Sequence, residues 1–591
     1  VGIVDGKTVI NPTSEQRKES EMDVTLCATK DKIVMIEAGA KEVPEQTMID
    51  AIFKAHEVNQ EIIKFIDTIV AECGKAKHSY ESCAIPEELF AAIREIVTPE
   101  QMERDNLKTG AYFTQMERGI FVVGKDKGGL FEETQMLTGD IFASYFAPVK
   151  TWDYAGTEDN DCYKLYRQWY NSPFNNAYTE VMQPWQSIVE NTDEVSPARA
   201  LATIVKVFGM SRITDKYGPI PYSKFGTGIH VAYDSQKDVY YRFFEELADA
   251  IDVLTGYNSR TSEPYMERYD YIYNGRVEKW IKFANTLRLR LAMRISYVDE
   301  TKARTEIEAA IGHSIGLMTS VDDNAVLKQS ASFTFINEWW EAFESFNDFR
   351  MSATMDCYLK GLQDPRLACY FKAAMKDGAY HGVRNGQTSR NQGTLSEAAS
   401  SMNVEQNDNI EWMGAAETYF LLAEAKLRLN LGDKTVQEYY EEGVRISFSS
   451  KGATGADTYL ADDTNVPATS FVDPTTERST DVSSMVSNLT VKWNDNATES
   501  KKLERIMVQK WIALFPDGQE AWSEMRRTGY PGIVTISSNR SGGEVPEGEL
   551  ISRLKFPTTE YSDNGENTQA AVSLLKGTDI AGTRLWWDVK R

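Results

Sequence analysis

The strongest constraint on the fold is a pair of apolar stripes between Glu411 and Phe448. From Glu411 to Leu431, apolar side chains recur at the spacing of one helix face. Gly432 suits a left-handed helix end, and Asp433 suits the N-cap of a second helix. A turn this short makes the two helices antiparallel. The pattern predicts a helical hairpin, and spacing alone favours an ordinary one, because one hairpin is not a repeat. The apolar positions are Ala416, Tyr419, Phe420, Ala423 and Leu427, then Val436, Tyr440 and Val444.

Length and charge allow a large folded core and exclude some classes of partner. The chain has 591 residues, of which 42% are hydrophobic, so several domains can bury apolar cores. Its formal net charge is −24. Binding to nucleic acid or to an anionic membrane surface needs a basic face, so we expect neither as a partner. Neutral sugars are compatible with this charge.

Metal-ligating and cofactor-holding residues do not cluster along the sequence. The six cysteines include no CxxC pair and the five histidines no HExxH motif, so we expect no cofactor and no metal. Cys73 and Cys83 could pair, but free thiols are the simpler expectation. The run Asp159–Asp161 could offer oxygens to Ca²⁺. It lacks the spacing and the glycine of an EF-hand loop, so solvated turn residues are the better interpretation.

Signals for a membrane span or for export are missing from the sequence. No run of 18 apolar residues could span a bilayer. Val1–Thr13 has neither the basic start nor the apolar block of a signal peptide, and no lipidation cysteine accompanies it. We therefore expect neither a spanning helix nor a lipid anchor in this sequence.

Residues 1–98 have a different pattern from the rest of the chain. Short alternating stretches are followed by long amphipathic ones, which predicts a small α+β fold. The expected elements are a hairpin at Val1–Pro12, strands at Val24–Ala28 and Lys32–Glu37, and helices at Gln46–Val70 and Ile85–Ile96.

This segment resembles part of bacterial polynucleotide phosphorylase, through INPTSEQRKES, ATKDKIVMIEAGAKEV and MIDAIFKAHEVNQEIIKF. The resemblance covers the end of the first RNase PH-like domain and the start of the helical domain behind it. It implies that the catalytic second core is missing. Glu37 and Glu42 could form a carboxylate pair, but solvated charges are the simpler interpretation. We expect no RNA processing by residues 1–98. Half a domain buries its own core poorly, which favours a joining error over a natural fusion.

From about Val97 to the C-terminal end, several long strings resemble the SusD/RagB family of glycan-binding outer-membrane lipoproteins. The resemblance implies a mainly α fold, in which a tetratricopeptide-type helical scaffold carries a loop-rich ligand-binding subdomain. The strings are ARALATIVKVFGMSRITDKYGPIPYS (198–223), KWIKFANTLRLRLAMRIS (279–296), FRMSATMDCYLKGLQDPRLACYF (349–371), AAETYFLLAEAKLRLNLGDKTVQEYYEEGVRISF (415–448), VQKWIALFPDGQEAWSEMRRTGYP (508–531) and TRLWWDVKR (583–591).

Two domains are therefore expected, the phosphorylase-like fragment over 1–98 and a SusD-like domain over 99–591. The helical hairpins should lie mainly in 106–312, 411–448 and 501–527, and polar loops in 313–409 and 533–591. The expected helices are Lys108–Val123, Glu132–Phe146, Asn176–Asn191, Pro197–Thr214, Asp238–Gly256, Trp280–Tyr297, Lys302–Ile311, Lys501–Phe515 and Gln519–Arg527.

Three stretches combine aromatic and polar side chains as sugar recognition requires, with rings for the C–H faces and polar groups for the hydroxyl edges. The first follows the second N-terminal helix, where the resemblance also implies a glycan-stacking ring. Burial in the core is the competing interpretation for any one ring. The candidate glycan-binding residues are Trp152, Asp153, Tyr154, Asn337, Trp339, Trp340, Tyr380, Arg384 and Asn385.

The resemblance implies a non-enzymatic role on the extracellular face of the outer membrane. Family members are lipid-anchored, hold an oligosaccharide and deliver it to a SusC-like TonB-dependent transporter. A glycoside hydrolase is the first alternative and would need two carboxylates about 5–10 Å apart across a cleft. No segment singles out such a pair. A protein-interaction scaffold without sugar binding is the second alternative.

Overall fold

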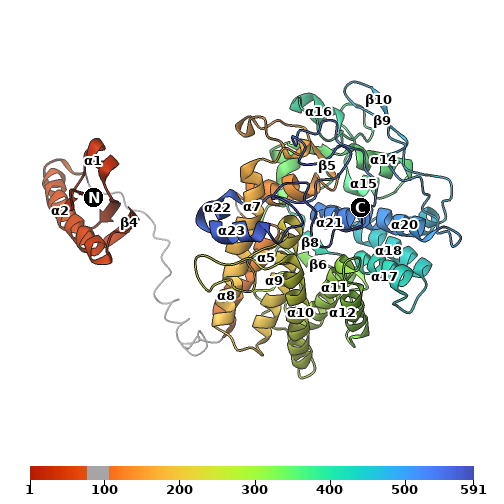
Figure 1. Ribbon diagram of the computed structural model, residues 1–591, viewed down its shortest axis with the longest axis horizontal. Coiled ribbons are helices and arrows are strands. Elements are labelled where there is room, and N and C mark those ends of the chain that lie inside the picture. Colours follow the sequence, from red (N-terminus) through yellow and green to blue (C-terminus); the bar gives the residue numbers. More distant parts are fainter. Residues whose placement is uncertain (76–104, 125, 591) are drawn as a thin grey trace. The chain divides into compact units, whose positions relative to one another are not determined.

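The structure is a computed structural model that describes residues 1–75, 105–124 and 126–590. The chain divides into two compact units, Val1–Val97 and Thr98–Arg591 (Figure 1). The helix expected at Ile85–Ile96 and the thiol of Cys83 lie outside the described residues.

The N-terminal unit is an antiparallel sheet with one long helix, which confirms the α+β class expected for it. The strand order is β2-β1-β3-β4, and α2 packs against β3. A short helix that the sequence pattern did not suggest, α1, begins at a capping box made by Thr13 and Gln16. The elements are β1 Gly2–Val4, β2 Lys7–Val9, α1 Ser14–Glu19, β3 Met22–Ala28, β4 Ile33–Ala40 and α2 Glu45–Cys73.

This unit has a small core and a large exposed apolar surface among its described residues. Its buried cluster consists of Ile3, Met22, Val24 and Ala51. Apolar side chains on β4 and along α2 face solvent, and Phe53 is 60% exposed. A sheet and helix that leave so much apolar surface uncovered are what part of a larger domain would present. The other exposed side chains include Val34, Met35, Ile36, Ile49, Ile62, Phe65, Ile66, Ile69 and Val70.

The second unit is mainly helical, as its sequence predicts. In Figure 1 its long helices α9 to α12 lie side by side, and each packs on the next in chain order. Their apolar faces and those of the helices before them form one continuous core. The helices of this part are α5 Asp105–Ile120, α6 Gly128–Phe131, α7 Arg167–Ala177, α8 Gln183–Glu190, α9 Pro197–Tyr217, α10 Gln236–Asn258, α11 Val277–Ile295 and α12 Glu300–Gly312.

The predicted central hairpin is present as α17 (Ala415–Leu429) and α18 (Val436–Lys451), which pack closely. A Cβ at Gly443 of α18 would lie 2.9 Å from the Phe420 ring of α17, so only glycine allows this approach.

The boundaries of this hairpin differ from those expected. The first helix begins at Ala415 rather than Glu411, because Ile410–Met413 forms strand β8 and pairs with β6 (Ala325–Leu327). Left-handed Asn430, not Gly432, ends it. Thr435, not Asp433, caps α18 through a capping box with Glu438.

A buried network of charges joins this hairpin to α11 and α21 (Gly518–Thr528). Arg294 of α11 contacts Glu520 at 2.5 Å and Glu524 at 2.6 Å. Arg527 bridges Glu524 at 2.6 Å to Glu424 of α17 at 2.5 Å. All five side chains are at most 8% exposed, so each charge depends on its partners rather than on water.

The region before β5 (Phe146–Pro148) differs from the single helix expected at Glu132–Phe146. Residues Glu132–Asp140 form a π-helix, η1, and Phe146 already belongs to β5, which pairs with β7 (Phe349–Met351). A second π-helix, η6, spans Glu341–Ser345. π-Helices are rare and often border functional sites.

The loop-rich parts carry only short elements. After α18 the structure places α20 at Glu499–Ala513 and then α21. The remaining elements are α13 Glu338–Trp340, α14 Ala353–Gly361, α15 Leu367–Tyr370, α16 Gln392–Ala398, α19 Ala456–Leu460, α22 Thr558–Asp563, α23 Gly565–Val572, the hairpin β9 Ser470–Val472 and β10 Ser479–Asp481, the π-helix η4 Tyr178–Met182 and three 3₁₀ turns, η2 Asp153–Ala155, η3 Asn160–Cys162 and η5 Val321–Asp323.

Candidate functional site

The three stretches proposed for glycan binding converge around β5, β7 and η1. The Trp152 ring lies 6.0 Å from the Phe349 ring of β7. Asn385 Nδ2 donates to the Phe146 carbonyl of β5 at 2.9 Å. Trp339 Nε1 donates to Asp140 of η1 at 3.2 Å. Segments far apart in sequence thus meet in one place, although these particular contacts lie inside the protein.

Four of the candidate residues are buried and bonded within the fold. Trp152 is 5% exposed and packs edge-on against Trp169 at 5.2 Å. Trp339 is 2% exposed and packs between Phe121 and Phe131. In this conformation neither indole offers a face to a sugar.

The two buried amides, Asn337 and Asn385, support local backbone structure. Asn337 Oδ1 caps α13 by accepting from the Trp339 and Trp340 amides at 3.1 and 3.3 Å. Asn385 Nδ2 also donates to Asp161 at 2.8 Å. Their polar atoms are therefore used to position the stretches.

Among the candidates whose side chains the structure describes, Tyr154 is the most accessible, with 62% of its surface exposed. It sits in η2, and its ring lies 5.8 Å from Tyr166 and 6.5 Å from Trp169. Partial burial raises the pKa of its hydroxyl to about 12, so the group is a neutral donor. An exposed ring braced by two others is a ready stacking platform.

The remaining candidates are half-buried or not described. Trp340 and Tyr380 pack partly against the main core. Arg384 Nε donates to the Thr535 carbonyl at 2.9 Å, and burial lowers the pKa of its guanidinium. The Asp153 side chain lies outside the described part of the structure.

A charged group that the sequence did not indicate lies beside Trp152. Lys150 Nζ lies 3.1 Å from Asp348 Oδ1 and 5.9 Å from the Trp152 ring centre. Burial raises the pKa of Asp348 to about 6 and that of Glu132 well above its ordinary value. No local pattern links Lys150 to Asp348, which are 198 residues apart. Tyr166, in contrast, belongs to the visible aromatic run that begins at Trp152.

The Asp159–Asp161 turn is built for hydrogen-bond donors instead of a cation. Asp161 accepts from Asn385 and the Gly386 amide at 2.8 and 2.5 Å, and Arg390 reaches it at 2.6 Å. Arg390 also contacts Asp159 at 2.7 Å. Within the described ranges, no group of three or more histidine, cysteine or acidic side chains could hold a metal ion.

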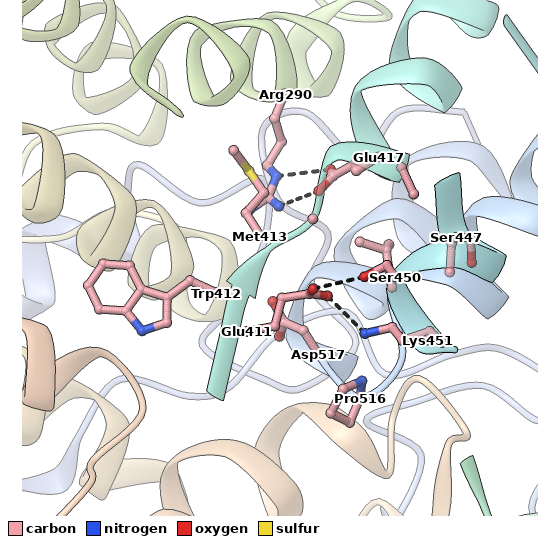
Figure 2. A pocket seen from close by; sticks show the side chains of 14 residues that line it. Arg290, Glu411, Trp412, Met413, Glu417, Ser447, Ser450, Lys451, Pro516 and Asp517 are labelled. Carbon is pink, nitrogen blue, oxygen red and sulfur yellow. Dashed lines mark hydrogen bonds and ion pairs between the residues drawn. The ribbon is translucent and has the colours of Figure 1, made fainter. Parts of the chain in front are cut away.

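Cavities of very different size occur in the second unit. The pocket whose lining residues are drawn in Figure 2 lies beside the central hairpin. Its volume is about 20 Å³, enough for about one water molecule. Its charges pair with one another, as Arg290 with Glu417 and Lys451 with Glu411, so it belongs to the scaffold. A cavity of about 450 Å³ opens between Tyr163, Thr535 and Leu550. Only cavities of the larger kind have room for a sugar ring.

The residues that the structure describes include no helix long and apolar enough to cross a membrane.

Family comparisons divide the chain in the same two parts as the sequence strings do. Residues 93–588 match the family described as Susd and RagB outer membrane lipoprotein. Residues 1–58 match the 3′ exoribonuclease family, domain 2. Polyribonucleotide nucleotidyltransferase from Lachnoclostridium phytofermentans is 54% identical over 138 residues, which are 23% of this chain and 19% of that protein. The chain thus spans about a fifth of the length of this curated relative.

Solved structures match the second part of this chain over nearly their own full length. A chitin-binding SusD homologue from Flavobacterium johnsoniae has a TM-score of 0.78 and 37% identity, covering 82% of this chain and 99% of that one. A SusD homologue from Bacteroides uniformis has a TM-score of 0.73 and 36% identity over the same shares. The chain belongs to the SusD-like family, and its N-terminal segment is similar to domain 2 of the 3′ exoribonucleases.

Proposed function

We propose that this chain binds an oligosaccharide at a surface centred on Tyr154 and passes it to a TonB-dependent transporter at the outer membrane. The observation that carries the proposal is the exposed Tyr154 ring, braced by Tyr166 and Trp169. Lys150, whose side chain is 36% exposed beside the neighbouring Trp152, offers a polar contact for sugar hydroxyls. The chitin-binding homologue, 37% identical, supports the ligand class.

Chitin oligosaccharides are the first ligands to test, with maltooligosaccharides as a comparison. Stacking on one ring contributes about 0.5–1.5 kcal/mol, so Tyr154→Ala should weaken binding about two- to thirteenfold in calorimetry. Tyr112→Ala, which removes a 39% exposed tyrosine from α5, should leave the affinity unchanged. Absence of binding to every glycan, or equal losses in both variants, would refute the site.

The same samples test the hydrolase alternative. Glu132 and Asp348 are buried carboxylates close enough for the charge of Asp348 to act on Glu132, and Lys150 already pairs with Asp348. We expect no shortened glycan after long incubation, because a protein that binds a glycan without hydrolysing it releases the glycan intact. Appearance of cleavage products that are lost in Asp348→Asn would favour an enzyme instead.

We further propose that the N-terminal unit neither binds nor degrades RNA. It covers only a small share of its curated relatives, and its matched family is one domain of those proteins. A gel-shift assay with single-stranded RNA should show no complex with the full chain. A phosphate-dependent loss of RNA would contradict this part of the proposal.

A further inference from the structure

A second cavity, separate from the Tyr154 surface, lies against α5. It has a volume of about 340 Å³ and is lined by one face of α5, the loop that follows it, the end of α7 and η4. This volume falls at the lower end of the range for small-molecule sites and fits about one sugar ring. The polar side chains on its wall are Thr114, Gln115, Arg118, Lys127, Asn176 and Glu180.

Arg118 is held in place by aromatic stacking. Its guanidinium carbon lies 4.5 Å from the centre of the Phe333 ring. Phe333 is 1% exposed and stacks on Tyr271 at 3.9 Å with an interplanar angle of 14°. Stacking fixes the plane of a guanidinium and leaves its N–H edge available. In the described part of the chain no carboxylate lies within ion-pair distance of Arg118.

The cavity wall carries more positive than negative charge. Lys127 is the second cation, and its side chain folds over Gly124. The carboxylate on the wall, Glu180, already accepts from Gln115 Nε2 at 3.0 Å. In a chain with a formal net charge of −24, such a cavity is a local attractor for an anion.

Hydrogen-bond acceptors lie beside these cations. Asn176 Nδ2 donates to the Gly119 carbonyl at 3.0 Å, and Gln115 Nε2 is bound to Glu180. Across the described residues, Asn176 Oδ1 and Gln115 Oε1 have no donor. Both amide oxygens can therefore accept from hydroxyl groups of a ligand.

We propose that this cavity binds an acidic monosaccharide unit, a uronic acid. Its carboxylate would pair with the Arg118 fork and Lys127, and its hydroxyls would donate to the oxygens of Gln115 and Asn176. We infer this ligand class because the cavity holds an oriented cation, Arg118, and two amide oxygens, those of Gln115 and Asn176. Its volume fits about one sugar ring. The site does not include Tyr154, so this proposal can be tested independently of the glycan-binding surface proposed above.

Calorimetry with D-glucuronate tests whether the cavity binds a uronic acid. D-glucose, which lacks the carboxylate, and acetate, which lacks the hydroxyls, are measured separately for comparison. Glucuronate should bind at least tenfold more tightly than glucose, and added salt should weaken it. Acetate should bind at least tenfold more weakly than glucuronate, because it has no hydroxyls. Equal binding of glucuronate and glucose would overturn the proposal, and so would equal binding of acetate and glucuronate.

Variants place the ligand in this cavity. Arg118→Gln should weaken glucuronate at least tenfold, while Arg268→Gln, a matched change at an exposed arginine, should not. Lys127→Gln should weaken glucuronate binding severalfold. Because Lys127 is not part of the Arg118–Phe333 stack, this variant tests the site even if Arg118→Gln disturbs the fold. Tyr154→Ala should leave glucuronate binding unchanged. Binding that survives both Arg118→Gln and Lys127→Gln would refute the site.

Discussion

Glu338 is a single residue whose charge is controlled by its surroundings. Its side chain is completely buried. One carboxyl oxygen accepts from the Gly124 amide at 3.2 Å, and within the described residues the other has no partner. Burial, together with the nearby carboxylate of Glu341, raises the pKa of Glu338 to about 8. The group is thus protonated at neutral pH.

Stability should therefore fall as the pH rises through about 8. A folded-state pKa above the unfolded value gives a contribution that is fully present below the unfolded pKa and is lost as the pH rises from there through the folded pKa. Between pH 6 and 9 the parent should lose about 2–3 kcal/mol through this group. Glu338→Gln should remove most of this loss in chemical denaturation, whereas Glu308→Gln, an exposed glutamate of α12, should not. Identical pH profiles for all three proteins would contradict the assignment.

At the level of single residues, the sequence shows where aromatic side chains occur, but it does not show which of them are exposed. Within the aromatic run after Lys150, Tyr154 is exposed while Trp152 is buried. Trp152 is covered by Phe349, and Trp339 by Phe121 and Phe131. These partners lie about 200 residues away in the chain, so no local pattern could show which ring would face solvent. The glycan-binding role of the accessible candidates remains a prediction.

At the level of elements, the buried charges decide how the helices are joined. Arg294 of α11 lies 3.3 Å from Asp215 of α9 and also reaches two glutamates of α21. Removing one partner from a buried ion network leaves the others without compensation, which costs far more than the loss of an exposed pair.

Arg294→Met should therefore destabilise the second unit by about 3–5 kcal/mol. The matched change Arg242→Met removes an arginine that is more than half exposed and pairs with Glu245 and with the less exposed Glu246. It should cost less than about 1 kcal/mol. Chemical denaturation followed by circular dichroism measures both. Equal effects of the two substitutions would show that the network does not hold these helices together.

Element types were largely predictable and element interruptions were not. The apolar spacing of α9, α10, α11 and α17 is local, so a single sequence reveals it. The apolar spacing extends the helix to Glu411, whereas Ile410–Met413 forms β8, because its pairing partner β6 lies about 80 residues earlier in the chain. The π-helical geometry of η1 also depends on tertiary packing, since its residues have no distinctive spacing.

At the level of the whole chain, two units with separate cores share one polypeptide. The N-terminal cluster contains four buried apolar residues, whereas the second unit has an extended main core and a small second cluster. Because the free energy of folding depends on buried apolar area, the first unit should be much less stable than the second.

Thermal unfolding should accordingly show two transitions, the lower one belonging to residues of the N-terminal unit. Met22→Ala, at a side chain 2% exposed in that unit, should lower or abolish only the first transition. Met507→Ala, equally buried in α20, should lower only the second by a few degrees, as a loss of about 2–5 kcal/mol predicts for a large domain. Scanning calorimetry distinguishes the outcomes. A single transition that shifts in both variants would mean that the two units fold cooperatively, and the independence of their cores would have to be abandoned.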